Sequence, residues 1–231
     1  LLLVHQYFNE EIYSGGARFN EMTKFWAEKG HEITVLAGMT VGFESKILPE
    51  YKGNPFVYKK HEKVNVWRCF SYGSHNTSFR SRLINYFSFV FSSTWAGIFK
   101  AGSGFDLILV SSPPLFLGIT AYLLSRLKRI PYVFEVRDLW PESAIDTGVV
   151  KNSLIISLAY RFEKFIYAKA KLINVLTPAF RDTLITSKNV PKEKVICISN
   201  AADFRLSDTY LDNFDINEFR KNNDLEGRFV I

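Results

Sequence analysis

The sequence of 231 residues is poor in cysteine, and its two cysteines do not form a recognisable pattern. Cys69 and Cys197 each lie inside a short apolar run, and their spacing fits neither a metal site nor a disulfide framework. We therefore expect two reduced thiols in the core of a cytosolic protein. The expectation for metals and organic cofactors is that none is bound.

A secretory signal and a nucleic-acid-binding stripe are also missing. The opening run Leu1–His5 has no charged region before it and no cleavage site after it, so we expect a strand already under way and not a signal peptide. No basic stripe is interleaved with aromatic side chains, which argues against nucleic acid as a partner. The net charge of +6 fits phosphates, nucleotides or acidic lipids without choosing among them.

Short apolar runs alternate with longer helical segments along a chain in which 47% of the residues are hydrophobic. The predicted strands are Leu1–His5, Glu32–Ala37, Val64–Phe70, Asp106–Ser111, Tyr132–Val136, Leu172–Leu176 and Val195–Ser199. The predicted helices are Gly16–Lys29, Ser81–Ala101, Leu115–Leu127, Ser153–Lys169 and Pro178–Ser187. This alternation predicts an α/β fold with a doubly wound, Rossmann-like parallel sheet.

Two segments interrupt the alternation. Gly38–Glu62 is long and polar and contains Pro49 and Pro55, so we expect a loop or an irregular excursion there. Residues 203–228 are polar and rich in charge, and they lead into an apolar ending that resembles the first strand of another domain. We therefore expect one domain over residues 1–202, and over 203–231 a linker and the first strand of a truncated second domain.

Ligands of a doubly wound sheet bind at the carboxyl ends of its strands, so the loops after the strands are candidate sites. The first of these loops closes on Gly15 and Gly16, where two glycines before a helix let backbone N–H groups approach a phosphate. No G-x-G-x-x-G pattern follows, which counts against a dinucleotide dehydrogenase. The alternative is that both glycines serve only the turn.

The most unusual run in the chain, residues 135–142, combines four charged side chains with Trp140 where a predicted strand ends. Neighbouring acidic and basic groups could hold a hydroxyl nucleophile or a phosphate, and the indole could stack on a sugar. The alternative is a purely structural cluster of ion pairs, because buried charges require partners.

Smaller polar groups follow other predicted strands. Ser111 and Ser112 precede two prolines, and Asn200 follows the last predicted strand, although a helix start and a turn explain these residues equally well. The four histidines are scattered, and only His5 lies at a strand's carboxyl end. No Ser-His-Asp arrangement is recognisable.

Residues Leu83–Phe99 form an uncharged, aromatic-rich stretch of 17 residues flanked by Arg80, Arg82 and Lys100. It is short for a transmembrane helix and contains interior polar residues. The favoured interpretation is a helix packed on the sheet, and the alternative is an amphipathic helix resting on an anionic bilayer.

Several motifs, taken in order, resemble the family 4 glycosyltransferases. These are Val4-His5-Gln6-Tyr7-Phe8 with Gly15-Gly16, then Glu28-Lys29-Gly30-His31-Glu32, then Glu135-Val136-Arg137-Asp138-Leu139-Trp140-Pro141-Glu142-Ser143, and finally residues 170–178 and 194–203. The resemblance covers nearly the whole chain. The branch it is most similar to contains bacterial O-antigen and capsule enzymes related to L-fucosamine transferases.

The resemblance implies half of a GT-B fold, in which two Rossmann-like domains face each other across a cleft. Such enzymes transfer a sugar from a nucleotide donor, here expected to be a UDP-sugar, with retention of configuration and usually without a metal. Gly15 and Gly16 would approach the donor diphosphate. The acceptor would be a polyprenyl-diphosphate-linked saccharide at the inner face of the cell membrane. We expect acceptor contacts from His5, Ser111, Ser112, Trp140, Glu142 and Asn200.

One position departs from the family pattern, because many relatives carry a histidine where this chain has Arg137. Arginine cannot act as a base at neutral pH, so we expect Arg137 to support a phosphate and Asp138 to orient the acceptor hydroxyl. In this family most nucleotide contacts belong to the C-terminal domain, so the resemblance also implies that the chain by itself turns over little or nothing. The competing interpretations are a nucleotide-sugar epimerase of the same architecture and a non-catalytic module that binds lipid-linked glycan.

Overall fold

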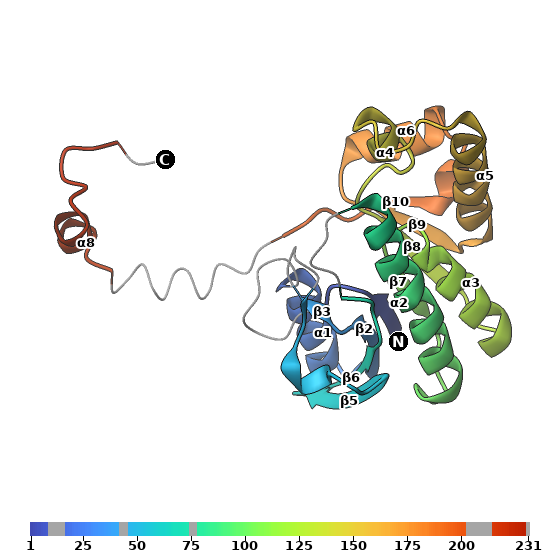
Figure 1. The fold of residues 1–231 in the computed structure, drawn as a ribbon, viewed down its shortest axis with the longest axis horizontal. Helices are drawn as coiled ribbons and strands as arrows, with labels where there is room; N and C mark the ends of the chain where they lie inside the picture. Colours follow the sequence, from blue (N-terminus) through green and yellow to red (C-terminus); the bar gives the residue numbers. More distant parts are fainter. Residues whose placement is uncertain (9–16, 42–45, 74–77, 202–213, 230–231) are drawn as a thin grey trace. The chain divides into compact units, whose positions relative to one another are not determined.

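The computed structural model describes residues 1–8, 17–41, 46–73, 78–201 and 214–229, which form two compact units, Leu1–Ser199 and Asn200–Ile231. The first unit contains an eight-stranded sheet in the order β10-β9-β8-β7-β1-β2-β6-β5 (Figure 1). Its strands are β1 (Leu2–His5), β2 (Ile33–Gly38), β5 (Phe56–His61), β6 (Val64–Cys69), β7 (Ile108–Ser111), β8 (Tyr132–Val136), β9 (Leu172–Val175) and β10 (Val195–Cys197). All neighbours pair in parallel except β5 and β6.

The helices of the first unit connect these strands, as the alternating pattern predicts. They are α1 (Ala17–Glu28), α2 (Phe79–Phe99), α3 (Leu117–Lys128), α4 (Glu142–Asp146), α5 (Ser153–Lys169) and α6 (Pro178–Thr186). The α/β, doubly wound, Rossmann-like class is therefore confirmed, and each predicted strand and helix is present within about two residues of its expected bounds. The short helix α4 was not predicted.

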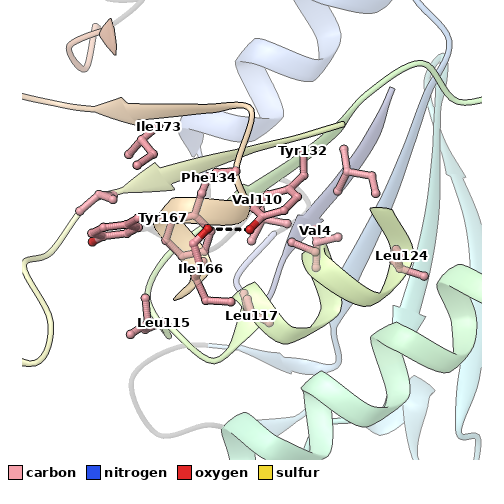
Figure 2. Close-up of a cluster of buried hydrophobic side chains, with 14 of the residues drawn as sticks. Val4, Val110, Leu115, Leu117, Leu124, Tyr132, Phe134, Ile166, Tyr167 and Ile173 are labelled. Atoms are coloured by element: carbon pink, nitrogen blue, oxygen red, sulfur yellow. Dashed lines mark hydrogen bonds between the residues drawn. The ribbon is translucent and has the colours of Figure 1, made fainter. Parts of the chain in front are cut away.

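The two faces of the sheet are covered by different helices, because successive side chains of a strand point to opposite faces. Leu2 and Val4 of β1 pack with residues of α2, α3, α5 and α6, whereas Leu3 packs with Phe19 of α1. In the larger of these clusters, the Tyr132 hydroxyl donates a hydrogen bond of 2.6 Å to the Ile166 carbonyl oxygen (Figure 2). The hydrophobic core thus has two layers, one on each side of the sheet.

The expectation of an irregular excursion over Gly38–Glu62 is wrong for part of that segment. It contains the short pair β3 (Thr40–Val41) and β4 (Lys46–Ile47), the 3-10 turn η1 (Pro49–Tyr51) and strand β5. β5 forms an antiparallel hairpin with β6 at the edge of the sheet, where its side chains are only partly buried. A half-exposed edge strand has a mixed apolar and polar sequence, so the sequence pattern typical of a strand is weak there.

Both cysteines lie in strands and neither is in a disulfide, as predicted. Cys69 is fully buried at the end of β6, and burial raises the pKa of its thiol. Cys197 is half-buried in β10. Both side chains pack as small apolar residues within the sheet.

The second unit contains α8 (Ile216–Asn222) within its described residues. Asp215 caps this helix, because its carboxylate accepts hydrogen bonds from the backbone N–H groups of Asn217 and Glu218. The last two residues, which were predicted to enter a strand, lie outside the described part of the chain.

Gly38 marks a close approach between the ends of β1 and β2. A Cβ atom at this position would lie 2.7 Å from the backbone carbonyl oxygen of Gln6, which cannot move aside as a flexible side chain would. We expect Gly38→Ala to lower the free energy of unfolding by about 1–3 kcal/mol in a urea titration. A stability of Gly38→Ala within about 0.5 kcal/mol of the wild type would contradict the argument.

Candidate functional site

A buried carboxylate organises the carboxyl edge of the sheet. Glu135, at the end of β8, is 1% exposed. Its Oε1 accepts hydrogen bonds from Arg18 Nη1 at 2.5 Å and Ser111 Oγ at 2.9 Å, and its Oε2 accepts one from Asn174 Nδ2 at 2.9 Å. Both oxygens are therefore satisfied, as a buried carboxylate requires. This network ties α1 to the ends of β7, β8 and β9.

His5 lies at the same edge, at the end of β1. It is 1% exposed, and its ring centroid is 4.6 Å from that of Phe19. Burial lowers its pKa to about 3, and the positive charges of Arg137 and Arg18 act in the same direction. The imidazole is therefore neutral at pH 7. Because this folded-state pKa is below the ordinary value, His5 opposes folding as the pH falls below about 6.5.

Arg137 and Asp138 follow β8 directly and differ from the other charged residues of their run. The Arg137 backbone N–H donates a hydrogen bond of 3.3 Å to Ser112 Oγ, which fixes the start of the turn. Within the described residues, neither side chain forms an ion pair. A half-buried guanidinium and an exposed carboxylate thus remain available to a ligand.

A cavity of about 270 Å³ opens beside these residues. Ser112, Asp138 and Trp140 line it from the strand ends, and Arg82 and Tyr86 line it from the first turns of α2. The indole of Trp140 is half-buried and packs edge-on against Phe116, with 5.4 Å between the ring centroids. An aromatic ring beside hydroxyl, carboxylate and guanidinium groups is a combination suited to a polar, ring-shaped ligand.

The short helix α4 supplies another wall of the cavity and is fixed by a buried cation. Ser143, Ala144 and Thr147 face the cavity. The preceding residue, Glu142, accepts a hydrogen bond of 2.6 Å from Lys188 Nζ, which also donates to Glu163 at 2.7 and 2.8 Å. The three charged groups form a clasp between α4, α5 and the loop after α6. Glu142 is thus in an ion pair and does not line the cavity.

Burial raises the pKa of Glu163 in this clasp, although Lys188 opposes the rise. We expect Lys188→Met to lower the free energy of unfolding by about 1.5–3 kcal/mol near neutral pH, since two charge-assisted hydrogen-bond partners are lost. A raised carboxyl pKa gives stability that is present at low pH and is lost as the pH rises through the folded-state value. The stability deficit of Lys188→Met should therefore become smaller as the pH is lowered from neutral toward the ordinary carboxyl pKa, as followed by urea titrations.

The exposed pair Lys24–Glu62 offers a control for this variant. Lys24→Met removes a cation whose side chain is 56% exposed, and exposed pairs contribute little. A stability deficit for Lys188→Met that stays constant from acidic to alkaline pH would contradict the role of Glu163.

The predicted site residues separate into groups. Ser112, Asp138 and Trp140 share the cavity. His5 and Ser111 are buried below it in the strand ends, and Glu142 belongs to the clasp. Four predicted positions remain. Arg137 follows β8 but is not among the residues that line the cavity, and Asn200 is exposed at the start of the second unit. Gly15 and Gly16 lie outside the described residues.

Sequence reasoning missed Arg18, Asn174, Arg82 and Tyr86. The sequence could have indicated Asn174, because it is a polar residue inside the apolar run of β9. No sequence pattern indicates Arg82 and Tyr86, because only the packing of α2 brings them to the strand ends. Among the described residues, no group of His, Cys, Asp or Glu side chains is placed to hold a metal ion.

Comparison with known proteins identifies the family. The profile of the family described as "Glycosyl transferase 4-like domain" matches residues 15–201, which includes most of the first unit. The chain belongs to this family. The match covers every element from α1 to β10, and with them the cavity and the buried network at Glu135.

The sequence of this glycosyl transferase 4-like domain is similar to that of a "putative colanic acid biosynthesis glycosyl transferase WcaI" of Escherichia coli K12. The two are 24% identical over 197 residues, which are 84% of this chain and 48% of WcaI. The chain thus spans about half the length of this curated relative.

Solved structures share the fold. The match to a sucrose-phosphate synthase of Thermosynechococcus elongatus covers 93% of this chain and 52% of the synthase chain, with 12% identity and a TM-score of 0.56. The match to HepE of Anabaena, in complex with UDP-glucose, covers 99% of this chain and 50% of the HepE chain, with 15% identity and a TM-score of 0.55. The doubly wound sheet predicted from the periodicity is therefore a fold that these solved structures share.

Proposed function

We propose that this chain is the acceptor-side part of a retaining glycosyltransferase that moves a sugar from a nucleotide-sugar donor to a lipid-linked saccharide. The observation that carries the proposal is that Asp138 and Trp140 line a cavity at the end of β8, where Arg137, the neighbour of Asp138 in the chain, has no ion-pair partner within the described residues. In this proposal Asp138 orients the acceptor hydroxyl, Trp140 stacks on the acceptor sugar, and Ser112 adds a hydroxyl contact. Arg137 balances the negative charge of a phosphate.

The buried residues below the cavity have supporting roles in this proposal. His5, neutral at pH 7, supports the floor of the site through its packing against Phe19. Ser111 orients Glu135, and Glu142 holds the cavity wall through Lys188. Gly15 and Gly16 approach the donor diphosphate, and Asn200 contacts the acceptor. The fold of HepE, whose structure was solved with UDP-glucose, supports a UDP-sugar as donor.

The proposed reaction is metal-free. In a front-face transfer the leaving phosphate can accept the proton of the acceptor hydroxyl, so a protein base is not required. Arg137 would then stabilise the charge that develops on the leaving phosphate, which is the largest contribution available to a residue that cannot accept a proton.

In the proposed organisation, residues 1–202 form the acceptor-side domain, and residues 203–231 lead into a donor-binding domain. The similarity to WcaI supports a role in bacterial surface polysaccharide synthesis, which includes O-antigen, capsule and exopolysaccharide. Within that class we propose an enzyme related to L-fucosamine transferases. The acceptor is a polyprenyl-diphosphate-linked saccharide, and the enzyme works at the cytoplasmic face of the membrane.

The experiment that tests the function uses the full-length protein with a lipid-linked acceptor and a panel of nucleotide sugars. Release of nucleoside diphosphate together with a glycosylated acceptor of retained configuration, read by NMR, is the expected result. Isomerisation of a UDP-sugar without acceptor would replace the proposal with an epimerase. Acceptor binding without turnover would replace it with a binding module.

A further inference from the structure

Helices α2, α3 and α5 lie in one layer over the same face of the sheet, α2 against α3 and α3 against α5 (Figure 1). The side of this layer that points away from the sheet is named the outer helical face here. No helix of the described chain is both long and apolar enough to span a bilayer.

The α2 part of the outer helical face is a continuous aromatic stripe. Ile84, Phe91, Trp95 and Phe99 are 53%, 73%, 55% and 64% exposed. At 100° per residue these four side chains fall within about 80° of the helix circumference. The opposite side of the helix contains buried residues such as Phe89 and Ala96. α2 is thus a packed helix, as the favoured interpretation predicted, that also presents a second apolar side to its surroundings.

Neighbouring helices extend the stripe. α3 exposes Leu123 and Leu127, and α5 exposes Leu154, Leu158 and Phe165. The ring of Phe165 contacts Tyr122 of α3 with 4.9 Å between centroids, which joins the two helices near this surface. Apolar residues scattered singly are normal on a protein surface, but several exposed apolar residues on each of three adjacent helices indicate an interaction surface.

The charge of the outer helical face has one sign. The three helices contain a single acidic residue, Glu163, which is 3% exposed and paired with Lys188. Their exposed cations are Arg80, Arg82, Arg126, Arg161, Lys164 and Lys169. By contrast, α1 on the other face of the sheet carries two exposed carboxylates, Glu21 and Glu28. Apolar and aromatic side chains among cations without exposed anions are typical of segments that rest on anionic lipid.

We propose that the outer helical face binds the surface of an anionic lipid bilayer, with the aromatic stripe inserted among the headgroups. A second copy of the chain is a poorer occupant, because two such faces would bring like charges together. Helix α2 also contributes Arg82 and Tyr86 to the cavity, so the proposed membrane contact and the cavity share one element of the fold. The proposed function is needed only to explain why the domain would bind a membrane, which is to reach a lipid-linked acceptor.

The test measures binding of the full-length protein to vesicles by co-sedimentation. We expect binding to phosphatidylglycerol vesicles, at least about tenfold weaker binding to phosphatidylcholine vesicles, and loss of binding as the salt concentration rises. Phe91→Ser with Trp95→Ser should weaken binding to the anionic vesicles by at least about tenfold. Phe25→Ser on α1, which removes an aromatic side chain that is 54% exposed on the other face of the sheet, is the matched control and should bind normally.

A second double variant keeps the test valid if Phe91→Ser with Trp95→Ser fails to fold. Arg161→Gln with Lys164→Gln leaves the aromatic stripe intact and should shift the salt dependence of binding. Unchanged vesicle binding in both double variants would overturn the proposal, as would a wild-type protein that self-associates through this face and ignores vesicles.

An activity assay with a short-chain, water-soluble acceptor separates this proposal from the proposed function. The surface variants should keep wild-type activity in that assay. If the wild type binds vesicles but has no transferase activity, the enzyme assignment fails and the surface assignment stands.

Discussion

Replacing Arg137 with alanine is expected to lower kcat of the full-length enzyme by about 10²–10³-fold, the loss typical of removing one preorganised donor from a developing negative charge. The reason is local. The Arg137 guanidinium is half-buried and has no acidic partner within the described residues, and its backbone is fixed by Ser112. Its charge is therefore positioned for a ligand. Single-turnover rates with saturating nucleotide sugar measure the loss.

Two further variants sharpen the result. Arg137→Lys keeps the charge but not the planar fork, so we expect intermediate activity. Arg181→Ala removes an exposed arginine that pairs with Asp182 on α6, far along the sequence from the cavity residues, and should leave the rate unchanged. If Arg137→Ala retains activity within about threefold of the wild type while remaining folded, the phosphate role is wrong.

Glu135→Ala is expected to lower the free energy of unfolding by about 3–5 kcal/mol, because it leaves a largely buried cation without its partner. The side chains of Arg18 and Glu135 are 14% and 2% exposed, and the carboxylate also accepts hydrogen bonds from Ser111 and Asn174. The Ser111 hydroxyl and the Asn174 amide would lose this acceptor as well. Chemical denaturation followed by far-UV circular dichroism measures the loss.

A double variant tests the cause. Arg18→Met together with Glu135→Met removes both charges, so we expect the double variant to be more stable than Glu135→Ala alone. Glu62→Ala is the control for loss of an exposed carboxylate and should change stability by no more than about 1 kcal/mol. A loss of less than about 1 kcal/mol for Glu135→Ala would show that the network does not hold the sheet edge together.

The sequence predicted the regular elements well because their burial is regular. β8 and α5 match their predicted bounds, since a fully buried strand reads as an apolar run and a surface helix repeats its apolar residues every three to four positions. The hairpin strand β5 was missed for the same reason. It is partly exposed, so its sequence resembles that of a loop.

The candidate site was predictable only in part. The run after β8 indicated charged residues at a ligand-binding edge, but it did not separate their roles. Glu135 and Glu142 are held by Arg18 and Lys188, which lie 117 and 46 positions away in the chain, whereas Arg137 and Asp138 are left for a ligand. Partners at such separations are chosen by tertiary packing, and a single sequence contains no record of that choice.

The clasp at Lys188 has a consequence for how substrate preference could change. α4 is fixed at its first residue, Glu142, by a cation from another part of the chain, and the side chains it turns toward the cavity, Ser143, Ala144 and Thr147, are all small. None of the three belongs to the hydrophobic core. Larger residues at these positions would narrow the cavity while leaving the core and the clasp in place. If the cavity binds the acceptor as proposed, substitutions in and directly after this short helix would alter the acceptor size that fits at little cost to folding.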